Sequence, residues 1–292
     1  MTPLRKRMLE ELQLRNLSEA TSNTYVQAVA RFAKHFGKSP EQLGPDYVRQ
    51  YLLHLLNDKK DTWSTLQVNR GALKFLYARV LKQSWFDEEI AAPKRRPTLP
   101  TILSPEQITR ILDRTNNLKH WTIIATFYAT ALRCTELRYL KVTDIDGQQM
   151  ILHVRHGKGS VPRDIPLSPV LRERLRVYYR WRKPNDWLFP SKQHPDRPLD
   201  DNSLRALCSS AGHRAGIPHA VHPHLFRHAC ATHMLNAGAD LRTIQVLLGH
   251  ADIRTTAKYL RVSLQRLQAV HSPFDALSLQ PIDGSQENGR QR

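Results

Sequence analysis

Residues 222–259 read HPHLFRHACATHMLNAGADLRTIQVLLGHADIRTTAKY, and the first six indicate a helix that can hold an anion at its start. Pro223 is typical of a first helical position, so His224 and Arg227, three residues apart, share one side of the first turn. Unpaired backbone N–H groups and the positive end of the helix dipole favour a phosphate there, and arginine adds a two-pronged donor. Taken alone, the pattern also fits a capping histidine beside a surface arginine.

Helical periodicity extends from this segment in both directions, and Ser104-Pro105-Glu106 marks a helix start upstream. Further helices are expected at residues 121–132, 136–140, 169–181, 203–215, 223–237, 241–248 and 255–260. The period changes at residues 149–154 and 161–167, which are strand-like. Gly157-Lys158-Gly159 lies between them and reads as a hairpin tip. The sequence therefore predicts a helical domain interrupted by a small sheet.

The first 90 or so residues predict a separate bundle of four helices. Ser18 is a cap candidate ahead of an apolar stripe that runs from Tyr25 to Phe36. Further helices are expected after Ser39-Pro40-Glu41, from Pro45 to Leu56, and along the pattern from Leu66 to Val80. Residues 93–100, PKRRPTLP, cannot be helical and read as a basic linker. The linker is either a strap along a DNA backbone or a solvated hinge.

The charge balance favours a polyanionic partner. The 292 residues hold 44 Lys and Arg against 26 Asp and Glu, a formal net charge of +18. Such an excess favours nucleic acid through counterion release, although a merely basic, soluble surface is the bland alternative. No secretory signal or membrane span is visible, so we expect a cytoplasmic protein with no membrane partner. The three cysteines are scattered, which predicts reduced thiols.

Two kinds of ligand site receive no support from the sequence. Six histidines lie between His213 and His233, but no H-E-x-x-H pattern and no carboxylate or cysteine at ligand spacing accompanies them, so no metal site is expected. Gly157-Lys158-Gly159 is not a phosphate-binding P-loop, because Leu152 stands where such a loop requires glycine. We expect no cofactor.

Five separate matches in one order give the sequence a family resemblance. They are ALRCTEL at 131–137, GKG at 157–159, HLFRH at 224–228, LGH at 248–250 and Tyr259. In these motifs the chain resembles the tyrosine recombinase, or phage integrase, family, closest in proportions to Xer-like and integron-like integrases. The resemblance implies a mainly α fold with a small β-sheet (α+β). It also implies a helical SAM-like core DNA-binding domain (1–92), the linker (93–100), a catalytic domain (101–275) and a disordered tail (276–292).

The resemblance also implies roles for individual residues. Tyr259 resembles the nucleophile, and the other catalytic positions are Arg133, Lys158, His224, Arg227 and His250. Glu136 and His228 match positions that we interpret as structural supports. Predicted DNA contacts are Lys94, Arg95 and Arg96 in the linker and Arg70 and Lys74 in the N-terminal domain. The implied partner is double-stranded DNA, bound by a homotetramer on two duplexes, possibly with a paralogous recombinase.

These residues suit phosphodiester cleavage on chemical grounds as well. Attack by Tyr259 on phosphorus would leave a 3′-phosphotyrosine, which conserves bond energy for rejoining. Arg133 and Arg227 stay charged and can stabilise the negative charge that develops on the phosphate, while Lys158 suits a general acid. The predicted function is site-specific recombination, integrase-like or transposase-like. The alternatives are type IB topoisomerase-like relaxation and a catalytically idle DNA-binding regulator.

Overall fold

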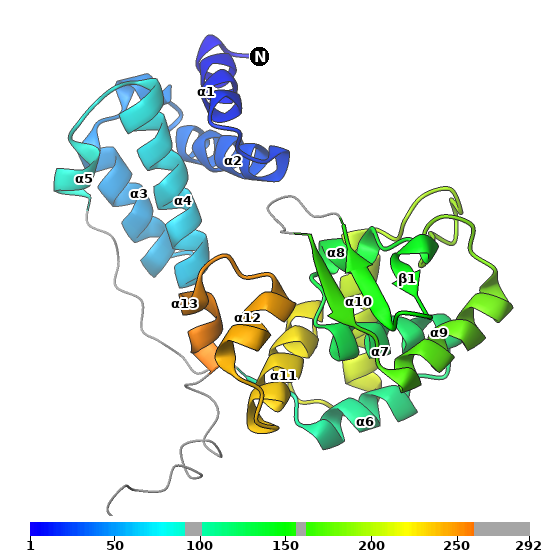
Figure 1. Cartoon of the computed structure of the whole chain (residues 1–292). Helices are drawn as coiled ribbons and strands as arrows, with labels where there is room; N and C mark the ends of the chain where they lie inside the picture. Colours follow the sequence, from blue (N-terminus) through cyan, green and yellow to red (C-terminus); the bar gives the residue numbers. More distant parts are fainter. Residues whose placement is uncertain (91–100, 156–161, 260–292) are drawn as a thin grey trace, which may run out of the picture. The chain divides into compact units, whose positions relative to one another are not determined.

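The computed structural model describes residues 1–90, 101–155 and 162–259. These residues belong to two compact units, the first holding residues 1–90 and the second residues 101–155 and 162–259 (Figure 1). The predicted linker at 93–100, the hairpin tip at 157–159 and the tail at 276–292 lie outside the described residues. Within the described part of the chain, no helix has both the length and the apolar character needed to cross a membrane.

The N-terminal unit is built from helices alone among its described residues. In chain order these are α1 (Pro3–Leu14), α2 (Glu19–Phe36), the 3-10 turn η1 (Pro40–Gln42), α3 (Pro45–Asn57), α4 (Trp63–Phe75), the π-helical turn η2 (Leu76–Val80) and α5 (Phe86–Glu89). Their core is aromatic, with the rings of Phe32 and Tyr51 5.2 Å apart. The buried Tyr77 hydroxyl donates to the carbonyl oxygens of Pro40 and Leu43, at 3.0 and 2.8 Å, so η2 is fixed to η1 and the residue that follows it.

The expected bundle is confirmed in outline and corrected in detail. The Ser18 side chain accepts the Thr21 N–H and caps α2 as predicted. The predicted helix after Ser39 is only a single 3-10 turn, because Leu43 is extended and Gly44 is the extended N-cap of α3. The pattern expected as one helix to Val80 changes at Leu76 into η2. Helix α1 was not predicted.

The C-terminal unit is a helical domain with one small sheet, as expected. Its helices are α6 (Pro105–Asp113), α7 (Leu118–Thr130), α8 (Cys134–Arg138), η3 (Val142–Asp144), α9 (Pro169–Arg182), α10 (Asp201–Arg214), α11 (Pro223–Asn236), α12 (Leu241–Leu248), α13 (Ile253–Thr256) and η4 (Ala257–Tyr259). The strands β1 (Ile145–Asp146), β2 (Ile151–Val154) and β3 (Arg163–Pro166) form an antiparallel sheet in that order. Leu152 pairs with Ile165, and both are buried against the helices. The unpredicted strand is β1.

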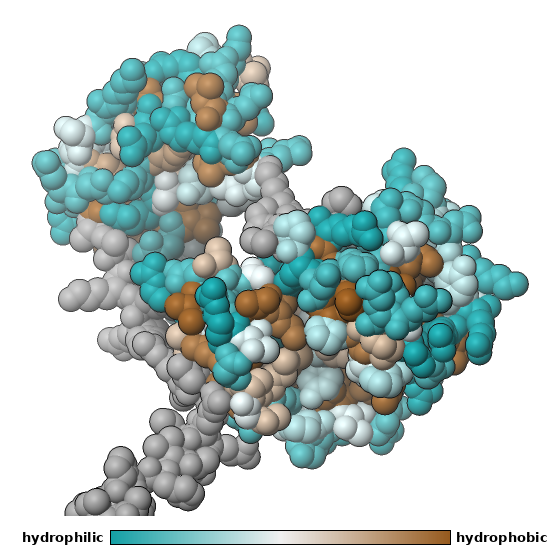
Figure 2. All heavy atoms as spheres, in the orientation of Figure 1, coloured by the Kyte–Doolittle hydropathy of each residue, from teal (hydrophilic) through white to brown (hydrophobic). Residues whose placement is uncertain are grey.

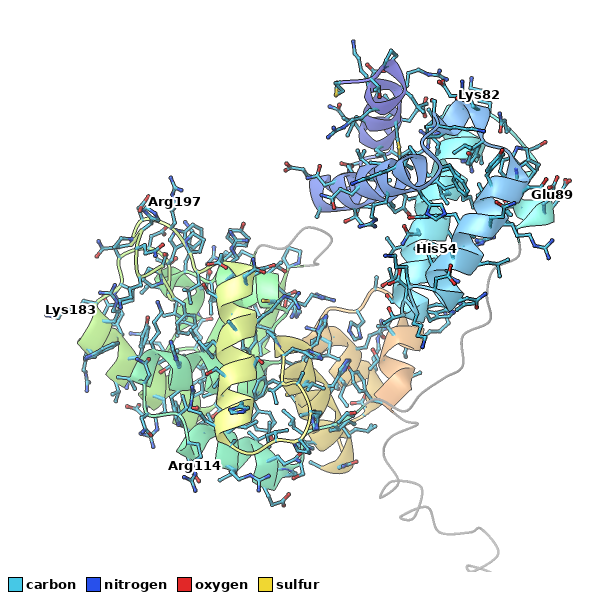
Figure 3. All side chains as sticks on the ribbon, turned by 180° about the vertical axis from the view of Figure 1, so that it is seen from behind. His54, Lys82, Glu89, Arg114, Lys183 and Arg197 are labelled. Carbon is cyan, nitrogen blue, oxygen red and sulfur yellow. The ribbon has the colours of Figure 1, made fainter. Side chains whose placement is uncertain are left out.

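Helix α7 lies in the middle of this unit and packs on α9 and α11. Its residues 122–127 are all buried. It ends at Ala131, which adopts a left-handed conformation with φ of 51°, and the chain then turns into α8 at Arg133. Charged side chains such as Arg114, Lys183 and Arg197 lie on the outside of the unit (Figure 3). Hydrophilic residues also predominate on the face of the N-terminal unit seen in Figure 2.

Candidate active site

Glu136 of α8 is a fully buried carboxylate among three arginines. Arg133 donates to Oε1 at 2.7 Å, and its backbone N–H donates to Oε2 at 2.8 Å. Arg163 of β3 donates to both oxygens, at 2.9 Å each. A nitrogen of Arg227 lies 3.9 Å from Oε2. Because a buried carboxylate is stable only when it is paired and hydrogen-bonded, this arrangement fixes Glu136 and the guanidinium groups around it.

The arginines also tie three chain segments together. Arg227 of α11 donates to the carbonyl oxygens of Ala131, after α7, and Leu248, at the end of α12, both at 2.6 Å. Arg133 donates to the carbonyl oxygen of Gly249 at 3.0 Å. The Arg227 side chain is only 3% exposed, whereas that of Arg133 is 28% exposed. An anion arriving from solvent therefore meets Arg133 more directly than Arg227.

His250 is held neutral beside these charges. Arg227 Nη2 donates to His250 Nε2 at 3.1 Å, so the proton of the neutral ring is assigned to Nδ1, which lies 2.9 Å from Thr256 Oγ1. Burial, together with the positive charges of Arg227, Arg133 and Arg163, lowers the pKa of His250 to about 4. In this arrangement Nε2 accepts a hydrogen bond.

Tyr259 is buried at the end of the described residues, with 4% of its surface exposed. It packs with Ala131, Ile244 and Leu248. Burial raises the pKa of its hydroxyl, and the positive charge of Arg227 opposes that rise. Its hydroxyl lies 3.0 Å from Nδ1 of His228 in a hydrogen bond.

The structure brings the five other predicted catalytic residues together with Tyr259 to different degrees. Arg133, Arg227 and His250 converge with Tyr259 around α11 and the ends of α7 and α12. His224 is exposed in the first turn of α11, and its ring centre is 5.9 Å from that of His228. Lys158 lies outside the described residues, as do Lys94, Arg95 and Arg96.

Two of the predicted DNA contacts, Arg70 and Lys74, lie in the N-terminal unit. One residue of the arginine cluster, Arg163, was not predicted. Arg70 donates to the carbonyl oxygen of Ile90 at 2.7 Å, and Lys74 pairs with Asp87 at 2.7 Å, so both make contacts within their unit. Arg163 was not predicted, although it is as closely bound to Glu136 as Arg133 is. The sequence places Arg163 near the start of a predicted strand, but that position does not indicate that its side chain contacts a buried carboxylate.

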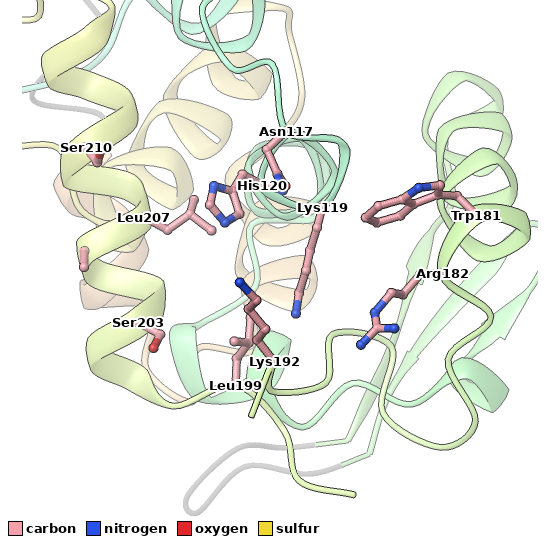
Figure 4. Close-up of a pocket in the computed structure, with 11 residues that line it drawn as sticks. Asn117, Lys119, His120, Trp181, Arg182, Lys192, Leu199, Ser203, Leu207 and Ser210 are labelled. Carbon is pink, nitrogen blue, oxygen red and sulfur yellow. The ribbon is translucent and has the colours of Figure 1, made fainter. Parts of the chain in front are cut away.

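A basic cavity of about 980 Å³ lies at the other end of α7. Lys119, Arg182 and Lys192 line it together with Trp181 (Figure 4). Arg133 follows the C-terminal end of α7, and a 13-residue helix is about 20 Å long at about 1.5 Å per residue. The cavity is therefore separate from the arginine cluster. Among residues 1–90, 101–155 and 162–259, no three His, Cys, Asp or Glu side chains gather in a way that could hold a metal ion.

Comparison with known proteins gives matches to both units. Residues 101–266 match the phage integrase family, and residues 4–87 match the phage integrase N-terminal SAM-like domain. The putative integrase/recombinase y4qK of Sinorhizobium fredii is 42% identical, over 95% of this chain and 90% of its own length. Tyrosine recombinase XerD of Brucella suis is 37% identical, over 73% of this chain and 75% of its own. The structure of XerH recombinase bound to its difH substrate shares the fold, with a TM-score of 0.70, 23% identity and coverage of 89% and 82%.

Proposed function

The chain belongs to the phage integrase family and is a site-specific DNA recombinase of the tyrosine type, and we propose that Tyr259 is its nucleophile. Attack of the phenol oxygen on phosphorus forms the Tyr259 O–P bond as the bond to the 5′ oxygen breaks. The product is a 3′-phosphotyrosine and a free 5′ hydroxyl, and reversal on a new 5′ end rejoins the strand. Neither relaxation alone nor an idle regulator is favoured by the recombinases and integrases that the chain resembles.

The observation that carries this proposal is the meeting of Tyr259 with two arginines of different exposure. Arg133, the more exposed, would bind a nonbridging phosphate oxygen, and Arg227 would add charge from within the fold. His250 and His224 would complete the phosphate site, and Lys158 would protonate the departing 5′ oxygen. Glu136 would act through the arginines it fixes. The reaction so described needs no cofactor.

The proposed partner is double-stranded DNA. The XerH structure is of a recombinase bound to its substrate, and the net charge of +18 suits a polyanion. Residues 1–92 would bind the core of the site, residues 93–100 would link the domains, and residues 101–275 would cut. We propose a homotetramer on two duplexes, with or without a paralogous partner, that acts in the cytoplasm in integration or transposition.

A covalent-adduct experiment tests the assignment of Tyr259. A duplex with a nick beside the cleavage point loses its short 5′ fragment, which traps the cleaved complex as a denaturant-resistant adduct on the 3′ phosphate. Tyr259→Phe should bind the site and form no adduct, because only the hydroxyl is lost. Tyr128→Phe is the matched control, since Tyr128 of the same unit also bonds a histidine through its hydroxyl, 2.9 Å from His233 Nδ1. An adduct with Tyr259→Phe, or one mapped to Tyr128, contradicts the assignment.

A further inference from the structure

We propose that His228, not only a structural support, accepts the proton of Tyr259 during cleavage and returns it during rejoining. The inference rests on the proposed function of Tyr259. Within the described residues, His228 Nδ1 is the side-chain atom hydrogen-bonded to the Tyr259 hydroxyl, at 3.0 Å. That distance is within the range for direct proton transfer, which needs about 2.6–3.2 Å between heavy atoms.

Burial makes a base necessary at this position. Tyr259 is 4% exposed, so solvent has little access to its hydroxyl. Burial also raises the pKa of the phenol, which makes spontaneous ionisation near neutral pH rarer than in water. A buried phenol that must become a nucleophile therefore requires a neighbour that can take its proton, and His228 lies at the right atom.

His228 also lies next to a second histidine of the predicted site, His224. His228 is half-buried one turn after His224 on α11, and the two rings stack with their centres 5.9 Å apart. The centre of the His228 ring is also 5.5 Å from that of the Tyr259 ring. His228 is thus close to both the buried Tyr259 and the exposed His224.

The positive charges around the pair favour the ionised form of Tyr259. The pair is faced by Arg227, His224 and Cys230 of α11, by Arg133 before α8, and by His250 after α12. Arg227 and Arg133 stabilise the phenolate. Once phosphorus bonds to the Tyr259 oxygen, the proton resides on His228 Nδ1 while the 5′ oxygen takes another proton, proposed above to come from Lys158. Atoms and charge therefore balance in both directions.

The tests compare His228→Gln with His233→Gln. Each substitution removes an imidazole of α11 whose Nδ1 is hydrogen-bonded to a tyrosine hydroxyl. The tyrosine is Tyr259 for His228 and Tyr128 for His233. With the nicked duplex in single turnover, His228→Gln should cleave about 10² to 10⁴ times more slowly while binding DNA normally, and His233→Gln should match the wild type. The wild-type rate should rise with pH and level off, and His228→Gln should lose that plateau.

A rescue separates proton transfer from structural support. Fluorinated tyrosine at position 259, whose ring fluorines lower the phenol pKa, should restore much of the rate to His228→Gln and change the wild type little. A purely structural role predicts no rescue. Equal rates and pH profiles for His228→Gln and wild type, or loss of the plateau in His224→Gln instead, would overturn the proposal. If the wild type itself forms no Tyr259 adduct, the proposed function fails first.

A second measurement needs no His228 variant. Acceptance of the proton requires Nδ1 of His228 to lack one in the uncleaved enzyme. In ¹⁵N-histidine spectra, the resonance that shifts in Tyr259→Phe should show an unprotonated Nδ1 near neutral pH. A protonated Nδ1, which would donate to the Tyr259 oxygen, rules out the base role.

Discussion

Glu136 is the buried carboxylate that holds the arginine side chains of the site together through hydrogen bonds and ion pairs. Its oxygens accept hydrogen bonds from Arg133 and Arg163, and Arg227 lies within ion-pair distance. Removing one partner of a buried ion pair is costly because the charges that remain are left uncompensated. Neutralising Glu136 would leave the positive charges of Arg133, Arg163 and Arg227 close together without their carboxylate.

We therefore predict that Glu136→Gln destabilises the C-terminal unit by about 3–5 kcal/mol. Because whole domains are stable by only about 5–15 kcal/mol, this loss would be a large fraction of the stability of the unit. The measurement is denaturant-dependent hydrogen exchange in α7, which belongs to this unit.

The matched control is Glu173→Gln. Glu173 also pairs with two arginines, Arg172 and Arg176, but its side chain is 55% exposed. Solvent screening makes such pairs weak, so the unfolding midpoint should not move measurably. Equal effects of the two substitutions would show that burial of Glu136 does not decide its importance.

Some residues of the site could be recognised from the sequence, and others could not. Arg133, Arg227 and His250 could be found because they sit in short motifs at characteristic spacing. Arg163 could not, because its contact with Glu136 joins residues 27 apart through a fold that the sequence does not specify locally. The contact of His228 with Tyr259 spans 31 residues and escaped prediction for the same reason.

Elements with wide buried faces were predictable, and elements with little burial were not. Helices α7, α10 and α11 bury many residues each, so their periodicity is visible. Helix α1 buries only Met8 and Leu12, which is too narrow a stripe to recognise. Strand β1 has only two residues, which is too short for an alternating pattern to show. The π-helical turn η2 keeps the apolar spacing of α4 and differs from it in its backbone hydrogen bonds, which the spacing does not reveal.

Helix packing leads to a prediction at Gly212, inside α10. A Cβ there would lie 2.4 Å from Val221 Cγ2 and 2.6 Å from Val221 Cβ. Alanine usually stabilises a helix relative to glycine by about 1 kcal/mol, but here the clash should prevail and cost about 1–3 kcal/mol. Thermal unfolding measures the loss, and Val221→Ala in the same chain should recover part of it.

Gly71, inside α4, provides the comparison. Its added Cβ would lie 3.2 Å from the hydroxyl oxygen of Tyr25, the far end of a side chain that can turn aside. Gly71→Ala should therefore leave stability unchanged or raise it by up to about 1 kcal/mol. A Gly212→Ala protein that is as stable as Gly71→Ala would show that α10 can shift away from Val221 at no cost.

For the whole molecule, the net charge of +18 predicts that binding of site DNA depends steeply on salt. Each phosphate contact contributes about −0.9 to the slope of log affinity against log salt, so six to ten contacts lower affinity about 10³ to 10⁵ times between 50 and 200 mM. Titration of the intact chain with labelled duplex measures this slope. If the affinity for DNA hardly changed with salt, the positive charge would be better explained as a basic surface that serves only solubility.

The same slope decides whether the basic linker touches DNA. If Lys94, Arg95 and Arg96 each neutralise a phosphate, replacing all three with alanine should reduce the slope by about 2.7, three times about 0.9. Tyr259→Phe, which removes no charge, is the control and should keep the wild-type slope. A wild-type slope in the triple variant would mean that the segment is a solvated hinge. The phosphate contacts would then have to come from the two units that it joins.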